Sequence, residues 1–209
     1  NVTGQNKGTS SDEQSDVDEF PRALIEEFDK SKNLLNGILT ENQLSAWVDH
    51  GLNIARHSTR SWEAATEFFK TSTKMIAICT GPNLISWAKV GVSICEESPV
   101  LATAYFKASF ETLPNIEPDR INDWAQTGMA LYNGTWKSST LSAKFFEESP
   151  RIFALLNFHQ AERLVGLLDI ISQRSYDMAT ECLALSVPVF KQAGSSKDTF
   201  LGLAEDVAN

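Results

Sequence analysis

Apolar residues recur three and four positions apart along most of this chain, and no segment alternates apolar and polar residues with a period of two. One such stripe consists of Leu44, Trp47, Val48, Gly51, Leu52 and Ala55, and its counterpart consists of Ile85, Trp87, Ala88, Gly91, Val92 and Cys95. Residues with this spacing share one face of an α-helix. The pattern predicts an all-α protein with helices at about 41–56, 59–72, 81–96, 99–111, 117–132, 138–149, 159–173 and 175–187.

Capping residues support these boundaries. Thr40-Glu-Asn-Gln43 has the form of a capping box, and Ser98 stands as an N-cap before a first-turn proline. Pro82 and Pro118 also fit the first turns of their helices, whereas Pro150 is expected to stop the helix before it. Short turns such as 74–79 and 151–157 are predicted between successive helix pairs.

Three stretches of the chain can be laid on one another. They begin with Trp47-Val-Asp-His-Gly51, Trp87-Ala-Lys-Val-Gly91 and Trp124-Ala-Gln-Thr-Gly128, and they close with Ser72, Ser109 and Ser149. The spacing between closing serine and next tryptophan is the same both times, from Ser72 to Trp87 and from Ser109 to Trp124. A fixed period of this kind is typical of stacked repeats. The chain is therefore predicted to be an α-solenoid-like array of helical hairpins of about 37–40 residues, a HEAT- or TPR-like superhelix.

A fourth, eroded unit follows, because the same spacing counted from Ser149 leads to Leu164, and Ser186 takes the place of the closing serine. The predicted units span about 41–79, 80–115, 116–157 and 158–190, with partial units at 19–40 and 191–209. The first partial unit would contain a closing helix from Phe20 to Ser31, and the last an opening helix from Leu201 to Ala208. Residues 1–18 contain almost nothing that could be buried and are predicted to form a disordered acidic tail or linker, as expected of a segment cut from a longer protein.

The recurring Trp-x-x-x-Gly step places a notch directly beside the indole, because residues four apart lie one above the other on a helix. Glycine inside a helix costs roughly 1 kcal/mol relative to alanine, so its repetition indicates that space is needed there. The expected occupants are aromatic residues of the partner helix, from the pairs Phe68-Phe69, Tyr105-Phe106 and Phe145-Phe146. The alternative is that these rings line a ligand groove.

The chain carries a net charge of −9, from 27 acidic and 18 basic residues. This balance argues against nucleic acid and anionic membranes as main partners, because phosphate groups are bound by clustered basic residues. Three scattered cysteines, Cys79, Cys95 and Cys182, do not form a disulfide framework and favour a cytoplasmic location. No apolar run approaches the roughly 20 residues of a membrane span.

Little in the sequence indicates catalysis, and we expect neither an enzyme nor a cofactor. His50 and His57 lie seven residues apart but lack a zinc-binding pattern, so no metal site is predicted. The residues best suited to bind a protein partner are two tryptophans outside the repeat register, Trp62 and Trp136, and two acidic pairs near predicted helix ends. The acidic pairs are Glu96 with Glu97 and Glu147 with Glu148.

The repeated Trp-x-x-x-Gly, serine and aromatic-pair pattern resembles the helical-repeat region that precedes a C-terminal von Willebrand factor A domain in proteins of the nitric-oxide-reductase-activation type. The Rubisco-activase adaptor subunits look like relatives of the same group. The resemblance covers residues 20 to about 208, and the Asp-x-Ser-x-Ser metal motif of the von Willebrand domain is not in this chain. It implies a partner role beside an AAA+ ATPase that remodels or matures another enzyme.

Together these features predict a non-catalytic protein–protein interaction scaffold, as a region of a larger protein. The alternative is a helical small-ligand carrier or enzyme with a pocket among the aromatic rows.

Overall fold

The computed structural model describes residues 20–135 and 138–208, and within these ranges the chain is all-α, without a strand. The predicted tail at 1–18 and Trp136 lie outside the described residues. The helices are α1 Arg22–Leu35, α2 Glu41–His57, α3 Trp62–Met75, α4 Gly81–Glu97, α5 Pro99–Thr112, α6 Ile121–Gly134, α7 Ser139–Phe153, α8 Phe158–Arg174, α9 Tyr176–Ala193 and α10 Lys197–Ala208. No described helix is long and apolar enough to cross a membrane.

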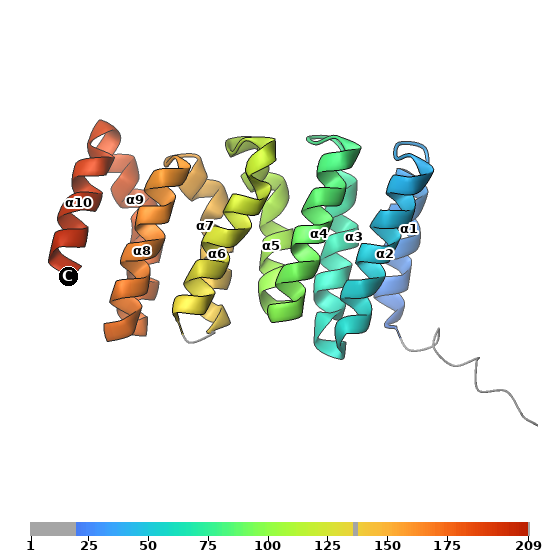
Figure 1. Ribbon diagram of the computed structural model, residues 1–209, viewed down its shortest axis with the longest axis horizontal. Coiled ribbons are helices and arrows are strands. Elements are labelled where there is room, and N and C mark those ends of the chain that lie inside the picture. The colour runs from blue at the N-terminus through green and yellow to red at the C-terminus, as the bar shows by residue number, and fades with distance from the viewer. Residues whose placement is uncertain (1–19, 136–137, 209) are drawn as a thin grey trace, which may run out of the picture.

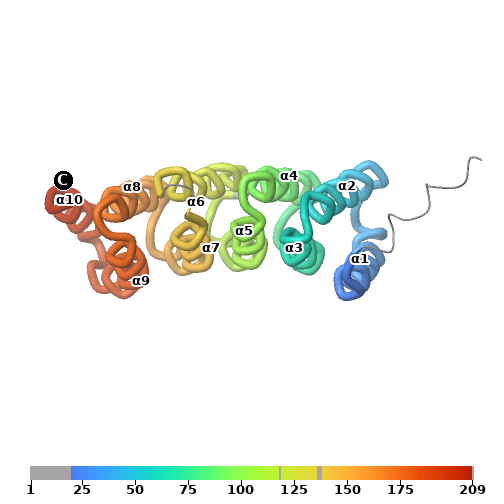
Figure 2. The backbone as a smooth tube through the Cα atoms, turned by 90° about the horizontal axis from the view of Figure 1, so that it is seen from below, coloured from blue at the N-terminus to red at the C-terminus, as the bar shows by residue number. Residues whose placement is uncertain are grey.

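The helices stand side by side in two rows along one axis (Figure 1). Figure 2 shows α2, α4, α6, α8 and α10 in one row, which we call the opening row, and α1, α3, α5, α7 and α9 in the other, the closing row. Successive members of the closing row from α1 to α7 pack against one another extensively, and each opening helix packs on its neighbours in the same row. The core lies between the two rows.

The predicted helix starts agree with the structure where caps were identified. The Thr40 side chain accepts a hydrogen bond from the Gln43 backbone N–H at 3.3 Å, and the Gln43 side chain accepts one from the Thr40 N–H at 3.0 Å. Ser98 accepts a hydrogen bond from the Leu101 N–H at 3.4 Å and caps α5. Two predicted helices begin instead with a 3-10 turn, at Thr59–Ser61 and Pro118–Arg120.

The prediction that Pro150 ends its helix was wrong. Helix α7 continues to Phe153 with Pro150 inside it, although proline removes one helical hydrogen bond. Ile152 and Phe153, in the extra turn, are buried in the core, and this burial offsets the lost bond. Helix α9 likewise runs past the predicted end at 187, through Pro188, and buries Phe190.

The glycine notches are filled as predicted. A Cβ atom added to Gly51, Gly91 or Gly128 would collide with a phenylalanine ring of the closing helix in the same unit. These rings belong to Phe69, Phe106 and Phe146. The other member of each aromatic pair faces the next unit: Phe68 stacks on Trp87 at 5.5 Å between ring centroids, and Tyr105 stacks on Trp124 at 4.8 Å. One continuous column of buried rings therefore joins the units.

Each repeated tryptophan is also hydrogen-bonded to the closing serine of its own unit. The indole N–H donates to the serine Oγ at 2.9 Å for Trp47 and Ser72, 2.8 Å for Trp87 and Ser109, and 2.9 Å for Trp124 and Ser149. Each serine hydroxyl in turn donates to the backbone carbonyl four residues earlier. All six side chains are fully buried. The tryptophan and the serine recur together because each serine supplies the hydrogen-bond acceptor for a buried indole N–H.

The closing helix expected from Phe20 to Ser31 is α1, which continues to Leu35, and Ser31 does not take the place of a closing serine. Phe28 stacks on Trp47 at 6.1 Å, and the sequence interval between these two rings equals that between Phe68 and Trp87, which also stack. In this register the position of the closing serine, four residues after the ring, belongs to Lys32, which is exposed. Ser31 instead donates a hydrogen bond across to the Phe69 carbonyl at 2.9 Å. No described tryptophan precedes α1, and its exposed side chains include Ile25 and Leu34 as well as Asp29 and Lys32.

Candidate partner-binding surfaces

The residues predicted to bind a partner do not meet in one site. Glu96 and Glu97 are exposed at the C-terminal end of α4 in the opening row, whereas Glu147 and Glu148 lie on α7 in the closing row. Trp62, the first residue of α3, is half-buried and packs against the core. Trp136 lies outside the described residues.

The acidic pair on α7 lies among cations of this chain. Glu148 pairs with Arg151 at 3.3 Å. Lys107 on α5 donates a hydrogen bond to Glu63 at 2.7 Å, and this bond raises the pKa of the Lys107 ammonium. Partial burial lowers the same pKa, and the charges of Glu63, Glu67 and Glu147 raise it further. Because α7 continues past Pro150, this acidic pair does not stand at the helix end as predicted.

The pair on α4 borders a groove between two opening helices. The groove has a volume of about 590 Å³ and is lined by Glu96, Glu97 and Lys89 from α4 and by Asn122 and Gln126 from α6, among others. Near the C-terminal end of α6, the Tyr132 hydroxyl donates a hydrogen bond to the Glu97 backbone carbonyl at 3.3 Å and so joins α6 to α4. Two of the predicted residues therefore stand on a polar groove of the opening row.

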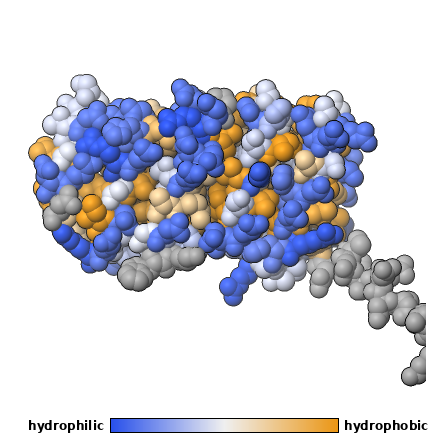
Figure 3. Space-filling view, viewed as in Figure 1, coloured by the Kyte–Doolittle hydropathy of each residue, from blue (hydrophilic) through white to orange (hydrophobic). Residues whose placement is uncertain are grey.

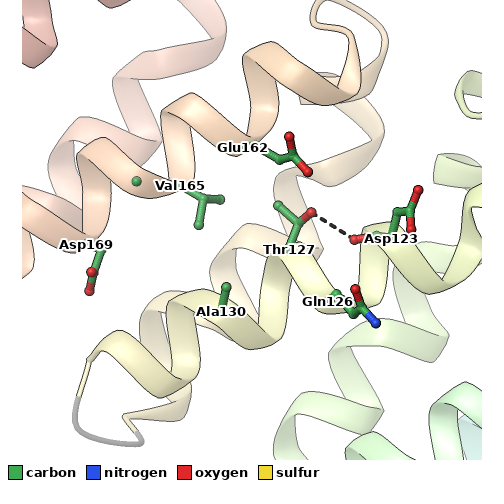
Figure 4. A pocket seen from close by; sticks show the side chains of 8 residues that line it. Asp123, Gln126, Thr127, Ala130, Glu162, Val165 and Asp169 are labelled. Carbon is green, nitrogen blue, oxygen red and sulfur yellow. Dashed lines mark hydrogen bonds between the residues drawn. The ribbon is translucent and has the colours of Figure 1, made fainter.

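A second groove lies between the next two opening helices, α6 and α8, with a volume of about 380 Å³ (Figure 4). Its lining comprises Asp123, Gln126, Thr127 and Ala130 from α6, and Glu162, Val165, Gly166 and Asp169 from α8. Figure 4 shows Asp123 and Glu162 on opposite sides of it, and a hydrogen bond of 2.8 Å from the Thr127 hydroxyl to the Asp123 carbonyl.

The two grooves are adjacent and together acidic. Gln126 lines both, and Arg120 pairs with Asp123 at 2.9 Å. One carboxylate oxygen of Asp169 is buried and finds no hydrogen-bond partner in the described part of the chain. Carboxylates along such a surface attract lysine and arginine side chains. This part of the opening row is suited to a basic protein segment.

The histidines do not form a metal site in the described ranges, where no three His, Cys, Asp or Glu side chains lie close enough to hold one ion. Partial burial lowers the pKa of His50, and the charge of Lys89 lowers it further while Asp49 opposes both. His57 stands at the end of α2, exposed.

A third groove, of about 350 Å³, is apolar and lies between α8, α9 and α10. Leu164 and Cys182 stand here at positions that carry tryptophan and an aromatic ring in the preceding units, and the smaller side chains leave the space open. Burial raises the pKa of the Cys182 thiol. Figure 3 shows hydrophobic side chains at the surface over the α8 and α10 end of the molecule.

The residues of the second and third grooves were not predicted from the sequence. Asp123 belongs to α6, whereas Glu162 and Asp169 belong to α8, and nothing in the sequence marks Asp123 as a neighbour of the other two. Met178 and Leu185 could have been found by extending the repeat register, because they are large apolar residues on the last closing helix.

We find no family model, no curated protein and no solved structure that matches this chain. The family suggested by the Trp-x-x-x-Gly pattern therefore stays a prediction.

Proposed function

We propose that this chain is a non-catalytic protein–protein interaction scaffold, an α-solenoid-like array of HEAT- or TPR-like hairpins whose opening row binds a basic protein partner. The observation that carries the proposal is the contrast between a repeated, filled core and grooves that differ from unit to unit. Trp47, Trp87 and Trp124 are fully buried in equivalent positions, while the side chains between successive opening helices change from one groove to the next. Repeat proteins bind partners through such variable surface positions on a constant core.

The ligand-carrier alternative places a pocket among the aromatic rows. In the structure the notches are occupied by Phe69, Phe106 and Phe146 themselves, and these rings pack edge-on against the tryptophans of their units at 5.1 to 5.5 Å. A ligand would have to displace buried rings to enter. This packing favours the scaffold.

The resemblance to the helical region of von Willebrand factor A proteins supports a more specific proposal. We propose that the scaffold is a region of a larger cytoplasmic protein and works with an AAA+ ATPase that remodels or matures another enzyme. The acidic grooves support a partner that presents lysine and arginine.

The test is a pull-down from lysate at low and high salt with three proteins. They are the wild type, an opening-row variant carrying Glu96→Lys and Glu162→Lys, and a closing-row control carrying Glu26→Lys and Glu111→Lys, two exposed residues of α1 and α5. We expect the wild type and the control to capture the same protein at low salt and the opening-row variant to lose it. Salt should weaken capture, because exposed charges are screened over about 8 Å at physiological ionic strength. If the wild type captures no protein but binds a small metabolite stoichiometrically, the ligand carrier replaces the scaffold.

A further inference from the structure

The two opening-row grooves occupy the same place in successive units. The α8 wall of the groove between α6 and α8 consists of Glu162, Val165, Gly166 and Asp169. In the register set by Trp124 and Leu164, these positions correspond to Asn122, Ala125, Gln126 and Met129, which form the α6 wall of the preceding groove. Equivalent positions therefore line both grooves, and their side chains make the difference.

Gly166 leaves the middle of the α6–α8 groove open without a reason inside the chain. A Cβ added to Gly51, Gly91 or Gly128 would meet a buried ring, whereas one added to Gly166 would meet nothing within 4 Å. Glycine inside a helix costs roughly 1 kcal/mol relative to alanine, and the equivalent position in α6 carries glutamine. The space at Gly166 is not needed for packing within the chain and is open to a side chain from outside.

Carboxylates stand at both ends of this space. Glu162 and Asp169 are seven residues apart and so share one face of α8, about 10 Å apart along the helix axis. Asp123 lies across the groove from Glu162 (Figure 4) and pairs with Arg120. Among the described residues, no cation pairs with Glu162 or Asp169. The groove therefore presents two carboxylates without counter-charges.

Asp169 gives an independent sign of a missing partner. Its Oδ1 lies buried against Gly134 and is the one buried side-chain nitrogen or oxygen atom in the described ranges that makes no hydrogen bond. Its Oδ2 accepts only a long hydrogen bond of 3.5 Å from Gln173. A partly buried carboxylate is costly without a positive charge nearby. A lysine or arginine at Oδ2 would offset that cost.

We propose that the groove between α6 and α8 binds an extended segment of the basic partner. One lysine or arginine of this segment lies between Asp123 and Glu162, a second lies three residues further along at Asp169, and short side chains lie between them over Gly166. The proposal rests on the scaffold function and names the form of the partner that the opening row binds. Charge complementarity selects the cations.

The spacing of the carboxylates selects an extended segment. In a polyproline II conformation, residues three apart share one face and lie about 9 Å apart, close to the separation of Glu162 and Asp169 along α8. A partner helix has a diameter of about 10–12 Å with its side chains, whereas the axes of packed helices lie about 8–10 Å apart. Such a helix would lie over the groove and would not enter the space at Gly166.

The probe is a synthetic fluorescent peptide in which two lysines are separated by two prolines, and a matched peptide has the same composition with the lysines adjacent. Binding is measured by fluorescence anisotropy with the wild type, Glu162→Gln, Asp169→Asn and Gly166→Gln. The control is Glu96→Gln, which removes an exposed charge of the neighbouring groove only. Gly166→Gln introduces the side chain that α6 carries at this position and fills the groove without changing its charge.

We expect saturable 1:1 binding of the spaced peptide to the wild type and to Glu96→Gln. Each of the three groove variants should bind at least about tenfold more weakly, equivalent to about 1.4 kcal/mol. Urea denaturation should show Gly166→Gln to be at least as stable as the wild type, because glutamine favours a helix over glycine, so its weaker binding would not reflect unfolding. No binding to the wild type, equal binding by all variants, or equal affinity for the two peptides overturns the proposal.

Spermidine tests the competing occupant, a small polyamine. If spermidine displaces the labelled peptide at a lower concentration than the unlabelled peptide does, the groove binds a polyamine and the proposal is overturned. The scaffold function is judged separately by the pull-down. Loss of capture in the variant with Glu96→Lys and Glu162→Lys, together with no peptide binding, would leave the scaffold standing and reject the extended segment.

Discussion

The hydrogen bond between each repeated tryptophan and its closing serine makes the stability of the fold depend on single residues. The Trp87 indole N–H is buried and donates to the Ser109 Oγ, and no other acceptor for it is found among the described residues, so removing that oxygen leaves a buried donor without a partner. The cost of such a loss is the desolvation of the donor, which exceeds the net gain from an ordinary hydrogen bond.

We therefore expect Ser109→Ala to lower the free energy of unfolding by about 1–3 kcal/mol. Ser186→Ala is the matched control. Ser186 is also buried and donates to the Leu183 carbonyl at 2.7 Å, but Leu164 replaces tryptophan in its unit. The control should lose markedly less stability, as measured by urea denaturation. Equal losses of unfolding free energy in the two variants would show that the hydrogen bond from the indole contributes nothing to stability.

The glycine notch gives a second prediction at this scale. An added methyl group at Gly91 would collide with the fully buried Phe106 ring, whereas one at Gly166 would meet nothing within 4 Å. We expect Gly91→Ala to destabilise the protein by about 1–3 kcal/mol through overpacking. Gly166→Ala should stabilise it by up to about 1 kcal/mol, because alanine favours the helix. Melting temperatures that move in the same direction for both variants would contradict the claim that the Phe106 ring fills a notch at Gly91.

Residue patterns predicted the notch and its occupants because both repeat in three successive units. The indole bond was not predicted, although the spacing from Trp47 to Ser72 is the same as that from Trp124 to Ser149. A repeated polar residue opposite a repeated tryptophan indicates such a bond only once the two helices are known to pack face to face.

At the scale of helices, the sequence identified each paired element but not where some of them end. Local residues specify the N-caps at Thr40 and Ser98, and both were predicted. The continuation of α7 through Pro150 depends on burial of Ile152 and Phe153 against other elements. Tertiary packing of this kind outweighs a local helix-breaking residue and is not visible in a short window of sequence.

Helix α7 should become more stable when its internal proline is replaced. Pro150→Ala restores a backbone N–H to the Phe146 carbonyl, and we expect unfolding to cost up to about 3 kcal/mol more. Pro99→Ala is the comparison, because proline suits the first turn of α5. That variant should be neutral or slightly less stable. Chemical denaturation of both proteins measures the difference. A Pro150→Ala protein that is less stable than the wild type would mean that the proline itself is required for packing at this end of α7.

Over the whole molecule, the repeat predicted the order of the helices, whereas the grooves arise between side chains from separate helices. The opening-row groove between α6 and α8 joins Asp123 with Glu162, and the apolar groove joins Leu185 with Phe200. Surface positions have no repeated signal, because the packing that makes the units alike does not constrain them. The surface that we propose binds a partner is therefore the part of the molecule that the sequence pattern describes least.

The two ends of the molecule should differ in local stability. At one end Phe28 stacks on Trp47 and joins α1 to the column of rings, whereas at the other Leu164, Cys182 and Leu183 replace the large rings and leave a groove. Regions with fewer buried contacts open at lower free energy. Hydrogen exchange followed by mass spectrometry should show the strongest protection in α3 to α6, weaker protection in α1 and the weakest in α9 and α10. Phe28→Ala, which removes the stacked ring, should lower the protection of α1 toward that of α10. Equal protection at both ends of the wild type would contradict this account, since local stability would then not follow the column of rings.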